Sequence, residues 1–105
     1  MRENLTEEEL AIFDILTRPE PALSGEEREE AKKVERQLLG RIHSLLGLDW
    51  RKKNQARARV QMAVEDMLYS LHHDLPGKYT DELYKQKCRS VFQHLFEKYV
   101  YSEVA

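Results

Sequence analysis

Residues 24–45, SGEEREEAKKVERQLLGRIHSL, carry the pattern that decides the fold. Ser24 has the hydroxyl of an N-cap residue, and Glu27 stands three residues later, where a capping box needs its carboxylate. Apolar residues then recur at steps of three and four, at Ala31, Val34, Leu38, Ile42 and Leu45. The pattern predicts one long amphipathic helix. Gly47 suits its end, and Gly40 would let a neighbouring helix approach.

A second start of the same kind precedes this helix. Thr6 and Glu9 repeat the capping-box spacing in LTEEEL, and residues 7–9 place negative charge at the positive end of a helix dipole. The apolar side of this helix consists of Ile12, Phe13 and Leu16. We expect the helix to end near Thr17, because prolines follow and the residue before a proline is pushed out of helical geometry.

Two more helices are predicted in the second half of the chain. Asp49 can cap the third, whose stripe is Val60, Val64, Met67 and Leu71. The turn residues of DLPGKYT, residues 74–80, interrupt the pattern. Thr80 can cap the fourth helix, whose stripe is Tyr84, Cys88, Val91, Leu95 and Tyr99.

These segments predict an all-α protein, a compact bundle of about four helices, the first short and the other three long. No segment alternates with the period of two that a half-buried strand requires. Residues 1–105 fit a single helical domain. In a domain of this size, the margin of stability is small.

Composition points to a cytoplasmic protein or a part of one. Cys88 is the single cysteine, so no internal disulfide can form. The first ten residues are not a signal peptide, because no apolar run follows their charges. No apolar stretch approaches the roughly 20 residues of a membrane span, so no membrane partner is predicted.

The segment LDWRKKNQARARV, residues 48–60, concentrates positive charge in a chain with a formal net charge of −2. Its five cations are Arg51, Lys52, Lys53, Arg57 and Arg59. On the third helix, Lys53 and Arg57 continue the stripe of Val60, although a buried unpaired cation is very costly. We therefore expect this basic segment to project past the core or to lie at its rim. We expect Trp50, just before it, to pack in the core.

Two interpretations of the basic segment remain open. It can be a solvated surface that pairs with the acidic starts of the first two helices. It can instead contact a partner, either phosphate groups or an acidic protein surface. Because the net charge is slightly negative, the domain would not bind DNA strongly by itself.

The sequence predicts no catalytic, cofactor-binding or metal-binding residue. It contains no phosphate-binding loop of the GxxxxGK[ST] type. The stretch DELYK, residues 81–85, superficially resembles nuclease motifs, but it stands at a helix start, where acidic residues are expected. His72 and His73 fit a helix C-terminus better than a metal site, and Cys88 fits the core better than a nucleophile.

Three segments resemble the C-terminal end of the restriction (R, or HsdR) subunits of type I restriction-modification enzymes. They are LTEEELAIFDILTRPEPALSGEEREEAKKVERQLL, LDWRKKNQARARV and YTDELYKQKCRSVFQHLFEKY, which together span most of the chain. The resemblance implies a helical fragment of a larger endonuclease subunit that uses ATP and Mg²⁺ to move along DNA. The nuclease and helicase motifs of that subunit have no match here, so no catalytic residue carries over.

In such enzymes the helical end is associated with docking the motor on the core of modification and specificity subunits, with duplex DNA as a further candidate partner. That would give the five cations a role in assembly. Two alternatives from other classes remain: a free-standing helical adaptor or dimerisation module, and a structural cap for the motor.

Overall fold

The computed structural model describes residues 6–46 and 50–98, and these residues form four α-helices and one short 3-10 helix. The elements are α1 (Glu7–Thr17), α2 (Gly25–Leu45), η1 (Trp50–Lys52), α3 (Asn54–Asp74) and α4 (Asp81–Lys98). The described residues contain no β-strand. The predicted all-α bundle is confirmed, including one short helix and three long ones.

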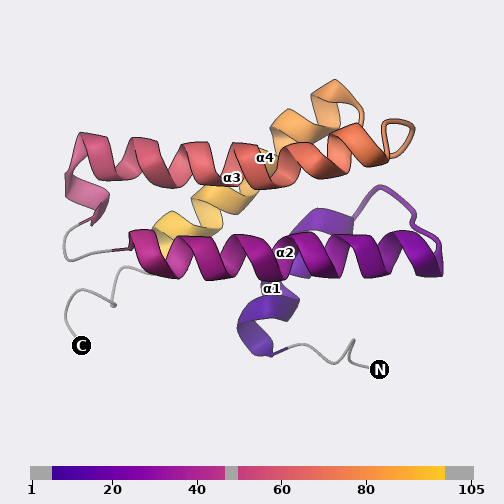
Figure 1. The fold of residues 1–105 in the computed structure, drawn as a ribbon, viewed down its shortest axis with the longest axis horizontal. Helices are drawn as coiled ribbons and strands as arrows, with labels where there is room; N and C mark the ends of the chain where they lie inside the picture. Colours follow the sequence, from indigo (N-terminus) through magenta and orange to yellow (C-terminus); the bar gives the residue numbers. More distant parts are fainter. Residues whose placement is uncertain (1–5, 47–49, 99–105) are drawn as a thin grey trace.

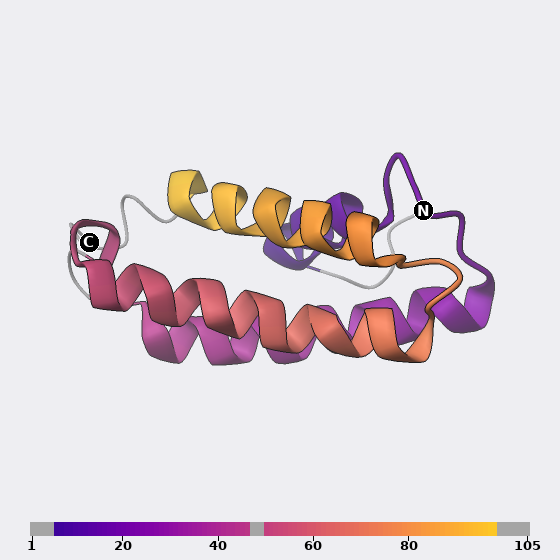
Figure 2. The ribbon, with the colours of Figure 1, turned by 90° about the horizontal axis from the view of Figure 1, so that it is seen from above.

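The helices form two layers. The helices α2 and α3 lie side by side and run in opposite directions (Figure 1). Seen from above, α1 and α4 form the second layer against this pair (Figure 2). The helix α1 contacts both α2 and α4, while α4 crosses α3 at an angle. Each layer can therefore cover the apolar face of the other.

Both predicted capping boxes are present. The Thr6 Oγ1 atom accepts a hydrogen bond from the Glu9 N–H at 3.1 Å, and the Glu9 carboxylate accepts one from the Thr6 N–H at 3.0 Å. Ser24 and Glu27 make the same pair of bonds at 3.3 and 2.8 Å. These bonds satisfy N–H groups that a helix start leaves without a backbone partner, so both starts are fixed locally.

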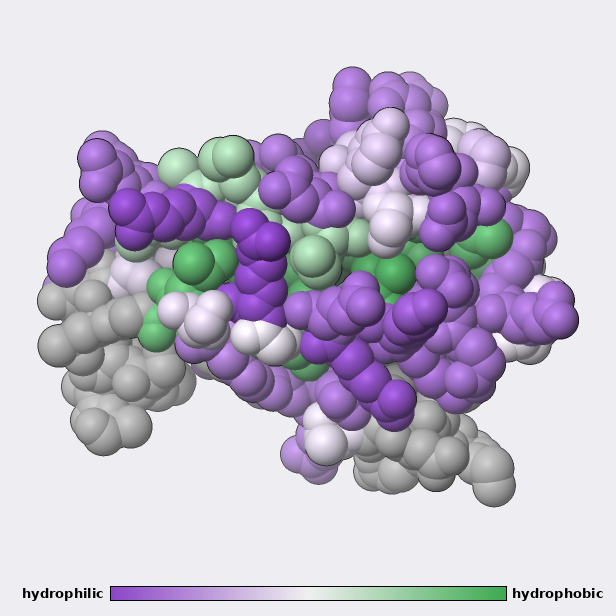
Figure 3. Space-filling view, viewed as in Figure 1, coloured by the Kyte–Doolittle hydropathy of each residue, from purple (hydrophilic) through white to green (hydrophobic). Residues whose placement is uncertain are grey.

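The core draws on all four helices and on the turn before α3. Its members include Ile12, Leu38, Val64 and Leu95, each with no exposed surface. Trp50 is buried as predicted, and its indole meets the rings of Phe92 and Phe96 edge-on, at centroid distances of 6.2 and 5.9 Å. Figure 3 shows apolar residues along the seam between α2 and α3, bordered by hydrophilic side chains.

The predicted start of the third helix was wrong. We expected this helix to begin at a cap on Asp49, but α3 begins at Asn54, and Lys53 at its N-cap position makes no side-chain cap. The 3-10 turn of η1 comes first, because it carries the Trp50 ring into the core.

Gly40 does not receive a neighbouring helix. It is exposed, and a Cβ atom added to it would meet nothing within 4 Å. The predictions about Gly47, Asp49 itself and Tyr99 concern positions outside the described residues.

Candidate functional site

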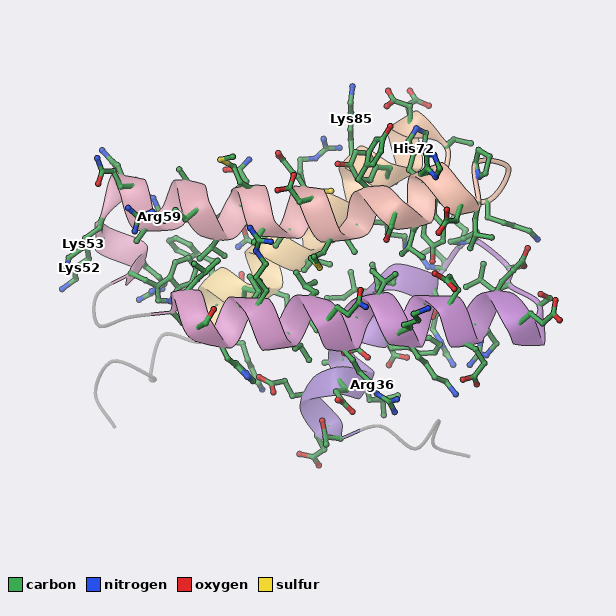
Figure 4. All side chains as sticks on the ribbon, viewed as in Figure 1. Arg36, Lys52, Lys53, Arg59, His72 and Lys85 are labelled. Carbon is green, nitrogen blue, oxygen red and sulfur yellow. The ribbon has the colours of Figure 1, made fainter. Side chains whose placement is uncertain are left out.

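The five predicted cations lie together at one end of the molecule. Arg51 and Lys52 belong to η1, Lys53 stands at the N-cap of α3, and Arg57 and Arg59 lie in the first two turns of α3. In Figure 4, Lys52 and Lys53 extend outward from this end, and Arg59 lies on α3 nearby. The structure divides the five into two groups.

Arg51 is tied into the fold. Its guanidinium lies over the Phe96 ring, 4.9 Å from the centroid, and its Nη1 atom donates a hydrogen bond to the Phe96 carbonyl at 3.2 Å. Its Nε atom is buried and has no hydrogen-bond partner among the described residues. The side chain therefore links the turn before α3 to the last turns of α4.

Arg57 is also used within the domain. Its Nη1 atom donates a hydrogen bond to the Arg51 carbonyl at 2.6 Å, and its Nη2 atom donates one to the Asn54 side chain. Lys53 makes no side-chain cap, and these bonds join η1 to the first turn of α3 together with the backbone bond from the Lys53 N–H to the Trp50 carbonyl. Arg57 stabilises the start of α3, and its charge is only half exposed.

Lys52, Lys53 and Arg59 point outward, and we call these three residues the basic tip. All three are exposed. Among the described residues, the Lys53 and Arg59 side chains have neither a hydrogen-bond partner nor an ion-pair partner. These two charges therefore make no polar contact within the described part of the domain.

The acidic helix starts have partners elsewhere. In α1, Glu8 pairs with His43 at 3.2 Å and Glu9 with Arg36 at 3.8 Å, both partners being on α2. In α2, Glu27 lies 3.8 Å from the ammonium group of Lys78.

A buried lysine that sequence analysis missed closes the end of α1. Lys87 on α4 is 5% exposed, and its ammonium group donates hydrogen bonds to the carbonyls of Ile15 at 2.7 Å and Arg18 at 2.9 Å. The Tyr79 hydroxyl donates a third bond, to the Leu16 carbonyl at 2.8 Å. Helix α1 has no basic residue in its own last turn, so a distant cation serves its negative end. Burial lowers the pKa of Lys87.

A buried carboxyl group was missed as well. Glu35 on α2 has no exposed surface, and neither of its carboxyl oxygens has a hydrogen-bond partner among the described residues. Burial, reinforced by the charge of Glu9, raises the pKa of Glu35 to about 8. A sequence signal existed: Glu35 lies midway between Ala31 and Leu39, at four-residue steps that share one helix face.

The side chains weighed for chemistry take structural positions. Cys88 is buried, and burial raises the pKa of its thiol to about 11, so it is no thiolate nucleophile at neutral pH. His72 donates a hydrogen bond from Nδ1 to the Tyr79 carbonyl at 2.7 Å, and its ring stacks on Tyr84. The part of the chain described here holds no cluster of three or more potential metal ligands.

Comparison with known protein families identifies the chain. Residues 1–97 match the family model described as "Type I restriction enzyme HindI endonuclease subunit-like, C-terminal". The chain belongs to this family. No curated protein and no solved structure gives a match. The resemblance inferred from the three sequence segments is confirmed at the level of the type I restriction enzyme family.

None of the helices in residues 6–46 and 50–98 is long and apolar enough to cross a lipid bilayer.

Proposed function

We propose that this domain is the assembly domain of a type I restriction endonuclease subunit, and that it docks the motor of that subunit on the modification and specificity core. The parent subunit would carry the ATP- and Mg²⁺-dependent translocation and DNA cleavage, and this domain would contribute no catalytic group. Family membership supports the assignment. The basic tip, with two charges that the fold leaves unused, is the observation that carries the docking role.

Exposed charges such as those of the basic tip contribute more to binding a partner than to the stability of the fold. Exposed ion pairs contribute only about 0–1 kcal/mol to stability, so three outward cations add little to folding. Across an interface, opposite charges speed encounter and exclude wrong partners. We therefore expect an acidic surface on the modification core to face Lys52, Lys53 and Arg59.

Duplex DNA is the second candidate partner for the same residues. It presents one phosphate charge about every 1.7 Å along its axis, which suits a small group of cations. The domain as a whole has a formal net charge of −2, so DNA contact would depend on the assembled enzyme.

The test reverses the three charges of the basic tip to Glu in a full-length endonuclease subunit of this family. The matched control reverses Arg18, Lys33 and Arg41, which are exposed and lie outside η1 and α3. Both variants change the net charge equally. We expect the tip variant to bind the purified modification core at least tenfold more weakly in the absence of DNA, and the control to bind like the parent. Arg51 and Arg57 are left unchanged because they stabilise the fold.

Salt dependence separates the two partners. If the tip contacts DNA, reversal should flatten the log–log dependence of DNA affinity on salt by about 0.9 per lost phosphate contact, and binding to the core without DNA should not change. A tip variant that assembles, translocates and cleaves like the control would refute the role of the tip in docking.

A further inference from the structure

A groove lies between α3 and α4. Its volume is about 600 Å³, and Tyr84, Cys88 and Phe92 line it from α4 at successive four-residue steps. Such steps place the three side chains in one row, about 12 Å long. Tyr84 and Phe92 are only half buried, so the row forms an apolar floor that solvent still reaches.

Apolar surface continues from the floor of the groove onto α3 at Tyr69, an exposed large hydrophobic residue with 51% of its surface accessible. The ring of Tyr69 also touches that of Tyr84, with centroids 5.9 Å apart, which makes its surface continuous with the floor.

The two walls of the groove carry opposite charges. Glu65 lines it from α3, while Lys85 and Arg89 line it from α4. Figure 4 shows Lys85 extending from α4 into solvent. The Arg89 side chain is exposed and has no hydrogen bond or ion pair with the described residues. Lys85 forms an ion pair with Asp81 at 3.2 Å, so on the α4 wall the charge of Arg89 is the one that the described residues leave available to an occupant.

We propose that this groove binds an amphipathic helix of a partner protein, with its apolar stripe on the floor, acidic residues beside Lys85 and Arg89, and basic residues beside Glu65. A second copy that pairs groove to groove is a poorer occupant, because two concave surfaces leave a void between them. A helix is convex, and helix-in-groove binding uses apolar anchors at steps of three and four residues. The opposite charges of the walls determine which flank of the helix faces which wall.

No residue of the basic tip lines the groove, so this inference holds whether or not the tip docks the modification core. The probe is a synthetic 14-residue helical peptide with an apolar stripe, Glu on one flank and Lys on the other. A second peptide has the same stripe and Lys on both flanks. Binding to the isotope-labelled domain is followed by amide chemical shifts in NMR titrations. We expect the mixed-flank peptide to bind saturably and to shift amides of α3 and α4 around Tyr84, Cys88 and Phe92.

Reversing the charge of the α4 wall should change which of the two peptides the groove prefers. Because Asp81 already pairs with Lys85, Arg89→Glu gives the α4 wall a net negative charge like that of Glu65. The mixed-flank peptide should therefore bind roughly fivefold more weakly and the lysine-flanked peptide more tightly, as expected when one surface attraction is replaced by a repulsion. Lys33→Glu changes the net charge equally on α2 and serves as the control. Tyr69→Ser should weaken both peptides, because it removes exposed apolar contact beside Tyr84. The dispersion of each amide spectrum confirms that the variant is folded.

Three outcomes would overturn the proposal. One is the absence of groove shifts at millimolar concentrations of either peptide. Another is equal binding of both peptides to the parent domain and to Arg89→Glu, which would indicate non-specific apolar adsorption. Shifts that map to the seam between α2 and α3 would place the binding surface elsewhere and would equally count against the groove.

Discussion

Replacing Glu35 by Met should stabilise the domain, and by more as the pH rises. Glu35 is completely buried on α2, and its two carboxyl oxygens have no hydrogen-bond partner among the described residues. Methionine has a similar length and no charge, so it can occupy the same space without a polar group. Replacing a buried, unpaired polar group by an apolar one of similar shape is neutral or stabilising.

The pKa of Glu35 fixes the sign and the size of the effect. The value rises from 4.5 to about 8 on folding, so between these pH values the native state holds a proton that the unfolded state has released. The free energy of unfolding therefore falls as the pH rises through this interval, by at most about 1.4 kcal/mol per unit. Relative to pH 4, protonation of Glu35 contributes roughly 3 kcal/mol less to the free energy of unfolding at pH 7. Above about pH 8 this contribution falls little further.

The assay is urea denaturation of the parent domain and of Glu35→Met at several pH values from 4.5 to 8.5. The difference in the free energy of unfolding cancels the titration of groups that the two proteins share. It should grow by roughly 4 kcal/mol across the range. Glu26→Met, at an exposed position of the same helix, controls for the loss of one carboxylate. A difference that stays constant with pH would show that Glu35 is ionised in the native state, and the argument from burial would fail.

Other predictions concern contacts within the fold. Lys87→Met should destabilise the domain by about 1.5–3 kcal/mol, because it removes charged hydrogen bonds, and hydrogen exchange should show lost protection in α1 first. Arg57→Ala should lower the free energy of unfolding by about 1–2 kcal/mol in thermal melts, whereas Arg59→Ala should change it by less than about 0.5 kcal/mol. Equal effects would contradict the distinction between Arg57, which is bonded within the fold, and Arg59, which points outward. Leu38→Ala and Leu95→Ala should each cost about 2–5 kcal/mol in denaturant titrations, since both side chains are completely buried.

Local patterns were enough to predict the helices. The capping boxes at Thr6 and Ser24 depend on residues three positions apart, and the apolar stripes depend on steps of three and four. The break between α3 and α4 follows from Pro76 and Gly77 in the same way. Each signal lies within one or two helical turns, so the sequence contains it without knowledge of tertiary contacts.

The candidate site was predicted only in part, because the roles of its residues depend on tertiary contacts. The cluster of cations is evident in the sequence, but Arg51 and Arg57 could be separated from the outward charges only once the 3-10 turn and the position of Phe96 were known. Lys87 and Glu35 were missed because an amphipathic pattern assigns charged residues to the surface. The groove required the crossing of α3 and α4, which periodicity does not determine.

The anchoring of α1 sets an order of events during synthesis of the chain. The carbonyl groups of Leu16 and Ile15 are held by Tyr79 and Lys87, which follow 63 and 72 residues later. At a translation rate of about 5–20 residues per second, the ribosome adds Lys87 roughly 4–14 s after Ile15. The hydrogen bond between them can form only later still, when Lys87 has left the ribosome. The antiparallel pair of α2 and α3 can form earlier. A premature stop before residue 87 would leave the apolar side of α1 without its cover from α4, and such truncated chains should be preferred substrates of chaperones and proteases.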